Sequence, residues 1–300
     1  MFSNTEFRCT IQAFYGVEQT MLAPHVGMNL GRGNRLDPHG HLLTTMIASG
    51  PGWRGQHDDV KNAIARSASE CKVEHTCEVY GVFAAYVGQN DMTGSHRQGM
   101  VPDFMFKIDH RESLAELKTI HQGRTWWTRR TIGTRCGALE KRQVKIPGEY
   151  HKKARNCDSN YNGWDAANPI PGPMQTRLAE FGPIKGLVVG PRGPASSGLH
   201  ELMVQIAEVG AEISWRAMGA RSVLEARSTL INRIRRTIGI TASRAAARLM
   251  IERLGVARGD GREAAKRRRN ADTSHRSFER EHYFANGPRA FAGGQPRKGW

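Results

Sequence analysis

Three charged residues have a spacing that would suit the hydrolysis of a phosphodiester bond. Asp103 follows Pro102, and after twelve further residues comes the triplet Glu116, Leu117 and Lys118. Such hydrolysis needs a divalent cation to offset charge on the phosphate and a group that positions water. The oxygens of Asp103 and Glu116 can hold Mg²⁺ or Mn²⁺, because hard cations prefer oxygen ligands. Lys118 would orient the attacking water or stabilise the charge that develops.

Two short apolar segments carry these residues and are predicted to form an antiparallel hairpin. The segments 103–108 and 113–120 are separated by a polar turn. Because side chains alternate along a strand, Glu116 and Lys118 project to one face and Leu117 points to the core. The alternative is an edge strand that carries Glu116 and Lys118 as a solvated pair on its outer face.

A strongly basic region follows directly. Between Glu116 and Arg155, eleven Lys or Arg stand against three acids, a net of +8 in a chain whose total is +16. Aromatic rings and guanidinium groups interleave there, a composition suited to base stacking and phosphate contacts. The predicted nucleic-acid contacts are Arg124, Trp126, Trp127, Arg129, Arg130, Lys152, Lys153 and Arg155. The competing interpretation places the tryptophans in the core and the arginines on a solvated surface.

The composition of the chain favours a polyanionic partner. The 300 residues have a sequence pI of about 10.1, which indicates nucleic acid, DNA in particular. A mean hydropathy of −0.54 and the lack of an apolar run near the ~20 residues of a spanning helix exclude an integral membrane protein. Glu6 and Arg8 interrupt the start, so no secretory signal is predicted. Five cysteines without a C-x-x-C pair indicate reduced thiols in an intracellular protein.

Other patterns predict an α/β core around the hairpin. Helical spacing predicts a helix over 57–70, and the Val, Tyr and Phe of 71–87 predict one or two strands. A basic helix is expected from about 147 to 158, because Pro suits a first helical position. The apolar run 185–190 predicts a buried strand, and 197–212 has apolar residues on one helical face.

Composition divides the chain into four parts. Residues 1–55 are rich in glycine and are predicted to be a loop-rich arm, and 56–214 form the core. Residues 215–258 are predicted to form basic helices broken near Gly239, which permits a helix-turn-helix, although two packed helices with basic outer faces are favoured. The Gly, Pro and Arg of 259–300 predict a disordered basic tail.

This succession, with P-D-F at 102–104 and E-L-K at 116–118, resembles the PD-(D/E)XK, or restriction-endonuclease-like, nuclease superfamily. Its core consists of a helix, a three-stranded meander, a helix, a strand and a helix, and the resemblance spans about residues 57–212. The segment RLDPHGHLL at 35–43, then Q-H-D at 56–58 and E-V-Y-G-V-F at 78–83, resembles the endonuclease-like region at the C-terminal end of retroelement polyproteins.

The resemblance implies that Asp103 and Glu116 bind the metal and that Lys118 assists catalysis. Glu70 or Glu78 could be the additional acid that some members use, and the sequence does not choose between them. A Cys/His cluster often precedes this region in retroelements. Here the candidate ligands lack the spacing of a zinc site; they are Cys9, His25, His39, His41 and His57.

The expected function is therefore that of a magnesium-dependent DNA endonuclease, and the second resemblance implies a retroelement origin. The alternative is a catalytically inactive nucleic-acid-binding protein with the same fold, and a third interpretation is a structural fragment without a specific partner. The basic run 266–269 has the composition of a nuclear import signal, so a nuclear location is a further expectation. The Gly/Pro/Ser turn at 190–198 resembles a phosphate loop in position but lacks the residues of one, so an ordinary strand-to-helix turn is favoured.

Overall fold

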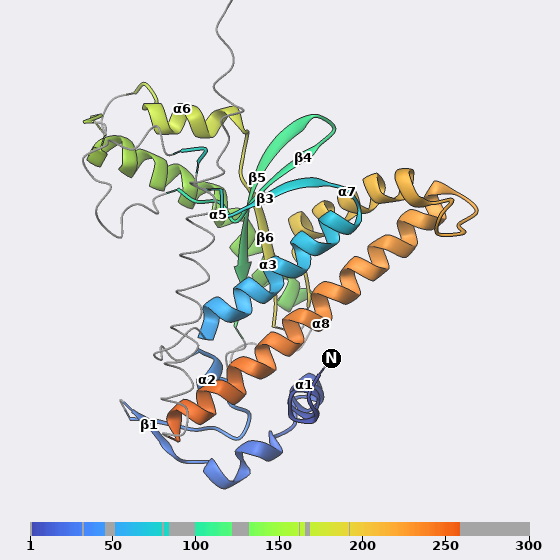
Figure 1. The fold of residues 1–300 in the computed structure, drawn as a ribbon. Coiled ribbons are helices and arrows are strands. Elements are labelled where there is room, and N and C mark those ends of the chain that lie inside the picture. Colours follow the sequence, from blue (N-terminus) through green and yellow to red (C-terminus); the bar gives the residue numbers. More distant parts are fainter. Residues whose placement is uncertain are drawn as a thin grey trace, which may run out of the picture.

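A mixed four-stranded sheet with helices on both faces forms the centre of the protein, which confirms the predicted α/β class (Figure 1). The structure, a computed structural model, describes residues 2–31, 33–45, 52–79, 81–83, 100–121, 132–161, 163–165, 169–191 and 193–258. The predicted contacts between Arg124 and Arg130 and the predicted tail at 259–300 lie outside these residues. None of the five cysteines, all of which lie in the described part of the chain, forms a disulfide. None of the described helices combines the length and the apolar character needed to cross a membrane.

The predicted hairpin is confirmed at the middle of the sheet. The strands are β3 (Glu74–Cys77), β4 (Phe104–Ile108), β5 (Arg111–Thr119) and β6 (Lys185–Val189). Their spatial order is β3-β4-β5-β6, with β6 parallel to β5 and the other pairs antiparallel. Asp109 and His110 form the two-residue turn with φ of 50° and 61°, the left-handed conformation that tight hairpin turns require. Because β5 lies between two strands, the predicted edge-strand alternative is wrong.

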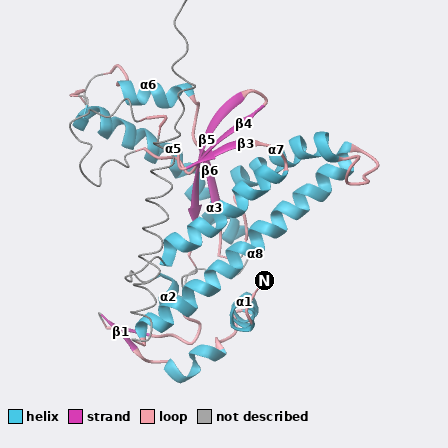
Figure 2. Ribbon diagram, in the orientation of Figure 1, coloured by secondary structure: helices cyan, strands magenta, loops and turns pink. Residues whose placement is uncertain are grey.

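One face of the sheet is covered by three helices, which are α3 (Gly52–Glu70), α7 (Ser197–Ser214) and α8 (Val223–Ala257). Apolar residues at helical spacing bury against alternate residues of the strands, as expected for one-sided burial. The sheet contributes Phe104, Phe106, Ala115, Leu117, Leu187 and Val189. The long α8 runs beside α3 and α7, as Figure 2 shows.

The other face packs against α5 (Ile132–Tyr161) and α6 (Pro173–Glu180). The prediction that α5 begins at Pro147 is wrong, because the helix starts fifteen residues earlier and Pro147 lies in its interior. An interior proline costs ~3 kcal/mol of helix stability. Packing against the sheet offsets that cost, because both halves of the helix are buried. Leu139 and Ile146 are buried before the proline, and Tyr150 is buried after it.

The predicted break at Gly239 is also wrong, since α8 is a single helix of 35 residues. A buried stripe of Ala226, Leu230, Ile234, Ile238 and Ala242 continues past the glycine at helical spacing. Tertiary packing thereby outweighs the ~1 kcal/mol that a helical glycine costs. The turn before α7 passes close to α8 at this point, and it is Gly193 that permits the approach, because a Cβ on Gly193 would lie 2.4 Å from the Cα of Gly239. A continuous helix leaves no helix-turn-helix in this segment.

The N-terminal segment is more regular than the predicted loop-rich arm. It forms α1 (Asn4–Tyr15), the 3-10 helix η1 (Thr20–His25), β1 (Asn29–Gly31), β2 (Asn34–Arg35) and α2 (His41–Thr45). Ser3 and Glu6 form a capping box at the start of α1, a signature that the sequence analysis missed. Leu22, Leu36 and Leu43 pack against Met250 and Leu254 of α8, so this segment shares its core with the C-terminal helix.

Candidate active site

Asp103 and Glu116 face each other at one end of the β4–β5 pair. Phe104 is paired with Ala115, so the next residues outward, Asp103 and Glu116, are cross-strand neighbours. The backbone N–H of Leu117 donates to Asp103 Oδ2 at 2.8 Å, which fixes the aspartate against β5. The structure therefore brings together the two carboxylates that the sequence proposed as metal ligands.

Glu116 is a buried acid with two partners. Its side chain lies on the face of β5 opposite Leu117, as the alternation predicted, and the residue is 5% exposed. Lys118 donates to Oε1, and the hydroxyl of Tyr150 on α5 donates to Oε2 at 2.6 Å. Burial and then the charge of Glu116 raise the pKa of Tyr150, so its hydroxyl remains a proton donor. Sequence reasoning missed Tyr150.

Asp103 is held by a histidine from α3. His57 Nε2 lies 3.0 Å from Asp103 Oδ1. Burial raises the pKa of Asp103, but the hydrogen bond and charge of His57, the Leu117 N–H and the charge of Lys118 outweigh it, so the pKa is lowered. Asp103 is thus an anion, and His57, which the sequence analysis named only among residues without zinc-ligand spacing, lies beside it.

A second ion pair lies one helical turn along α3. Lys61, four residues after His57, is 6% exposed, and its Nζ lies 2.5 Å from Glu78 Oε1 and 3.5 Å from Asp58 Oδ1. Burial lowers the pKa of Lys61, but the hydrogen bond and charge of Glu78, with Asp58 and Asp103, outweigh it and raise the pKa. The i, i+4 spacing of His57 and Lys61 is the signal that could have found this lysine.

The two candidates for an additional acid have separate positions. Glu78 lies beside Asp103, because its backbone N–H donates to the carbonyl of Asp103 at 2.9 Å. Glu70 is at the far end of α3, thirteen residues and about 20 Å along the helix from His57, and pairs with Arg233 of α8 at 3.1 Å. Of the two, Glu78 is the one that the structure places at the site.

We refer to these groups together as the acidic cluster. Its members are His57, Asp58, Lys61, Glu78, Asp103, Glu116 and Lys118. Four carboxylates and two ammonium groups give a formal charge of −2 before any charge on His57 is counted. A local excess of acid in a chain of net charge +16 attracts a cation.

The acidic cluster contains carboxylate oxygens, which are the ligand type that a magnesium ion would use. Among the described residues, no three His, Cys, Asp or Glu are grouped so that they could hold a metal. Mg²⁺ keeps several waters and is commonly bound by one or two carboxylates together with substrate phosphates. Asp103 and Glu116, as cross-strand neighbours, would supply two such carboxylates.

A stacked group of side chains braces the edge of the site. Trp53 at the start of α3 stacks on His121, which follows β5, with ring centroids 5.0 Å apart, and Arg253 of α8 lies 4.8 Å from the Trp53 ring centroid. His121 Nδ1 is 3.0 Å from Gln56 Oε1. Burial, followed by the charge of Arg253, lowers the pKa of His121 to about 4. This neutral histidine links the end of β5 to the residue that precedes His57.

Three predicted nucleic-acid contacts lie on the exposed side of α5. Lys152, Lys153 and Arg155 are exposed, and Lys153 Nζ lies 4.6 Å from the ring centroid of Tyr150. A basic surface therefore adjoins the helix residue that contacts Glu116. The other predicted contacts lie outside the described residues.

The two weaker sequence signals have structural roles. The N-terminus of α7, where a phosphate could bind, is occupied by a carboxylate, because Ser197 N and Oγ donate to Glu140 at 2.7 and 2.8 Å. Asp37 accepts from the backbone N–H groups of His39, His41 and Leu42, so the D-P-H-G-H segment forms the start of α2.

Comparisons with known proteins add no relatives. No protein-family model matches the chain, and neither a curated protein nor a solved structure matches it.

Proposed function

We propose that this protein is a metal-dependent endonuclease that hydrolyses phosphodiester bonds of DNA. The observation that carries the proposal is the cross-strand placement of Asp103 and Glu116, with Lys118 in contact with Glu116. Two facing carboxylates and an adjacent ammonium group can hold a divalent cation and stabilise charge on a phosphate.

The order of the elements supports the same proposal. Helix α3, the antiparallel strands β3, β4 and β5, helix α5, the parallel strand β6 and helix α7 follow one another along the chain. This is the succession that the resemblance to PD-(D/E)XK nucleases implies. The retroelement origin and the nuclear location are proposed from the sequence alone.

Each residue of the site has a separate task in this proposal. Asp103 and Glu116 would hold the cation, which when bound offsets negative charge on the phosphate. Lys118 would orient the attacking water. His57 and the Leu117 N–H hold the Asp103 carboxylate in place, and the Tyr150 hydroxyl does the same for Glu116. The exposed Lys152, Lys153 and Arg155 would hold the DNA backbone.

A specific observation favours the second candidate, a nucleic-acid-binding protein without catalysis. Each carboxylate of the pair already has protein donors: Lys118 and Tyr150 for Glu116, and His57 and Leu117 for Asp103. In that role the pair would hold β4, β5, α3 and α5 together, and basic surfaces alone would bind phosphate.

Cleavage of supercoiled plasmid DNA in Mg²⁺, Mn²⁺ or EDTA distinguishes these candidates. We expect metal-dependent nicking by the unmodified protein, and its loss in Glu116→Gln and Lys118→Ala with DNA binding retained. Glu112→Gln is the matched control, because Glu112 is an exposed acid at the other end of the same strand. It should cleave at the unmodified rate.

Two results would contradict the nuclease. Equal cleavage by Glu116→Gln and by the unmodified protein would remove the site from the chemistry. The absence of cleavage with either metal, together with DNA binding that weakens steeply with salt, would establish the non-catalytic alternative.

A further inference from the structure

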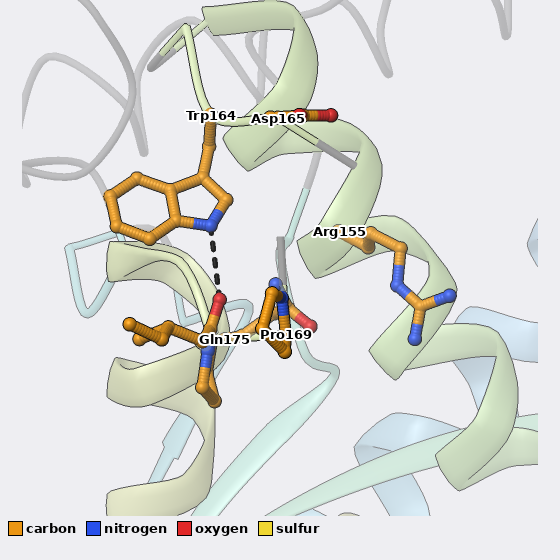
Figure 3. A pocket seen from close by; sticks show the side chains of 7 residues that line it. Arg155, Trp164, Asp165, Pro169 and Gln175 are labelled. Atoms are coloured by element: carbon orange, nitrogen blue, oxygen red, sulfur yellow. Dashed lines mark hydrogen bonds between the residues drawn. The ribbon is translucent and has the colours of Figure 1, made fainter. Parts of the chain in front are cut away.

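A separate cavity lies beyond the C-terminal end of α5, outside the acidic cluster. It has a volume of about 270 Å³ and is lined by Arg155, Trp164, Asp165, Pro169, Ile170, Pro171 and Gln175. Figure 3 shows the indole of Trp164 on one side and Arg155 on the other. Neither the metal chemistry nor the strand pairing of the proposed active site uses these side chains.

The walls of this cavity are held in place by hydrogen bonds. The Trp164 indole N–H donates to the carbonyl of Ile170 at 3.1 Å, the contact drawn in Figure 3, and its backbone N–H donates to the carbonyl of Asp158 at 3.0 Å. These two bonds fix the plane of the indole. A preformed aromatic wall loses little side-chain entropy when a ligand stacks on it.

The buried carboxylate of Asp158 fixes the opposite wall. It accepts from the backbone N–H groups of Met174 at 2.7 Å and Gln175 at 3.1 Å, at the start of α6. A Cβ on Gly172 would lie 2.4 Å from this carboxylate, so the glycine permits the approach. One residue thereby positions both Trp164 and the segment that faces it.

The lining defines the chemistry of the ligand. Trp164 and two prolines provide apolar surface for a flat ring, and Arg155, exposed and without a carboxylate partner among the described residues, provides a positive charge. Asp165 at the rim disfavours a ligand with several negative charges. A flat ring with one phosphate is a nucleotide unit, and aromatic stacking with a basic side chain is how proteins hold unpaired bases.

We propose that this cavity binds one unpaired base of a nucleic-acid strand, stacked on Trp164 with its phosphate at Arg155. The net charge of +16 favours a polyanionic occupant over a peptide. Arg155 is five residues, or about 7.5 Å along the helix, from Tyr150. The cavity and the acidic cluster are therefore both supplied with side chains by α5, and the binding proposed here does not require that the cluster cleaves the strand.

The test compares two single strands in EDTA, so that cleavage plays no part. Fluorescence anisotropy measures the Kd of a labelled thymidylate 12-mer and of the same strand with every base replaced by an abasic site. Trp164→Ala should weaken binding of the base-bearing strand by about 5- to 150-fold, the effect of losing one stacked base, and leave the abasic strand unchanged. Trp164→Phe should restore most of the affinity.

Two further variants separate stacking from charge and from general effects of tryptophan loss. Arg155→Gln should weaken both strands alike and reduce the salt dependence. Trp215→Phe is the matched control, because Trp215 also has a neighbouring arginine, Arg216 at 4.9 Å, but lies at the end of α7. It should bind both strands like the unmodified protein.

Three outcomes would overturn the proposal. Trp164→Ala could lower the affinity for both strands equally, which would indicate a structural effect, or it could leave both affinities unchanged. The third is that the unmodified protein binds neither strand. Failure of the plasmid-cleavage test alone would leave it standing, because the binding assay contains no metal.

Discussion

The hydroxyl of Tyr150 donates to Glu116 Oε2 at 2.6 Å and so joins α5 to the central strand of the sheet. Both residues are buried, so water does not substitute for either partner. The contact leaves Lys118 at the other oxygen of the same carboxylate. Glu116 is thus held by a neutral donor on one side and a cation on the other.

Removal of the Tyr150 hydroxyl should destabilise the folded protein. Tyr150→Phe leaves a buried carboxylate oxygen without its donor, and we expect the free energy of unfolding to fall by about 1–3 kcal/mol. Urea unfolding followed by circular dichroism measures it. Tyr15→Phe is the control, because Tyr15 is 72% exposed, and its unfolding midpoint should not change. Equal midpoints for both variants would show that the Tyr150 contact is not stabilising.

The buried lysine of α3 provides a second prediction. Lys61→Met removes one partner of Glu78, whose side chain is 32% exposed, so solvation reduces the penalty and we expect the free energy of unfolding to fall by about 1–3 kcal/mol. Lys107→Met breaks a pair with Glu74 in which both side chains are exposed, and it should cost less than about 1 kcal/mol. Chemical unfolding of both variants tests the difference, and a larger loss for Lys107→Met would contradict it.

Acid should loosen the contact between α1 and α8. Burial raises the pKa of Glu6, but hydrogen bonds from the Ser3 N–H and Arg248, with the charges of Arg248 and Arg244, outweigh it and lower the pKa from 4.5 to about 2. The unfolded chain therefore binds this proton more readily, and the stabilisation is present above about pH 4.5 and is lost as the pH falls toward 2.

Glu6→Gln should therefore be less stable than the unmodified protein at pH 7, with a difference in melting temperature that shrinks between pH 4.5 and 2. Thermal unfolding across this range measures the difference. Glu18→Gln alters an exposed acid and should show no such convergence. A constant difference at every pH would mean that packing of Glu6, and not its charge, holds α1.

The spacing of apolar residues in the sequence was sufficient to predict β5, β6 and α7. The alternation around Leu117 placed Glu116 and Lys118 on one face. A continuous apolar run predicted β6, and apolar residues at helical spacing predicted α7. The length of α5 could not be predicted in this way. Pro147 opposes a helix locally, and only the sheet that covers Leu139 and Tyr150 compensates for it.

The remaining parts of the site depend on contacts between distant residues. His57 is 46 residues from Asp103, and Tyr150 is 34 from Glu116. No local spacing encodes either pair, because the sheet register and the placement of α3 and α5 decide both. Glu70 and Glu78 were equivalent in the sequence for the same reason, and the direction of α3 separates them.

Two glycines with positive φ allow the cost of backbone strain to be measured apart from the cost of crowding. One of them, Gly193, lies in the turn before α7 and contacts α8. Gly193 and Gly219 both have positive φ, 84° and 68°, but a Cβ meets Gly239 Cα at 2.4 Å for Gly193 and meets nothing within 4 Å for Gly219. Gly219→Ala should cost about 1–2 kcal/mol from strain alone. Gly193→Ala should cost about 1–3 kcal/mol more, because the turn must move away from α8.

Gly239→Ala should stabilise the protein, whereas Gly193→Ala and Gly219→Ala should destabilise it. Its Cβ would meet Gly193 Cα at 3.9 Å, an ordinary contact, and alanine favours the interior of a helix over glycine by about 1 kcal/mol. We expect the free energy of unfolding to rise by up to that amount in urea titrations. If Gly239→Ala were as destabilising as Gly193→Ala, the helix would need a glycine for flexibility at this position, and α8 would behave as the two helices that its sequence first indicated.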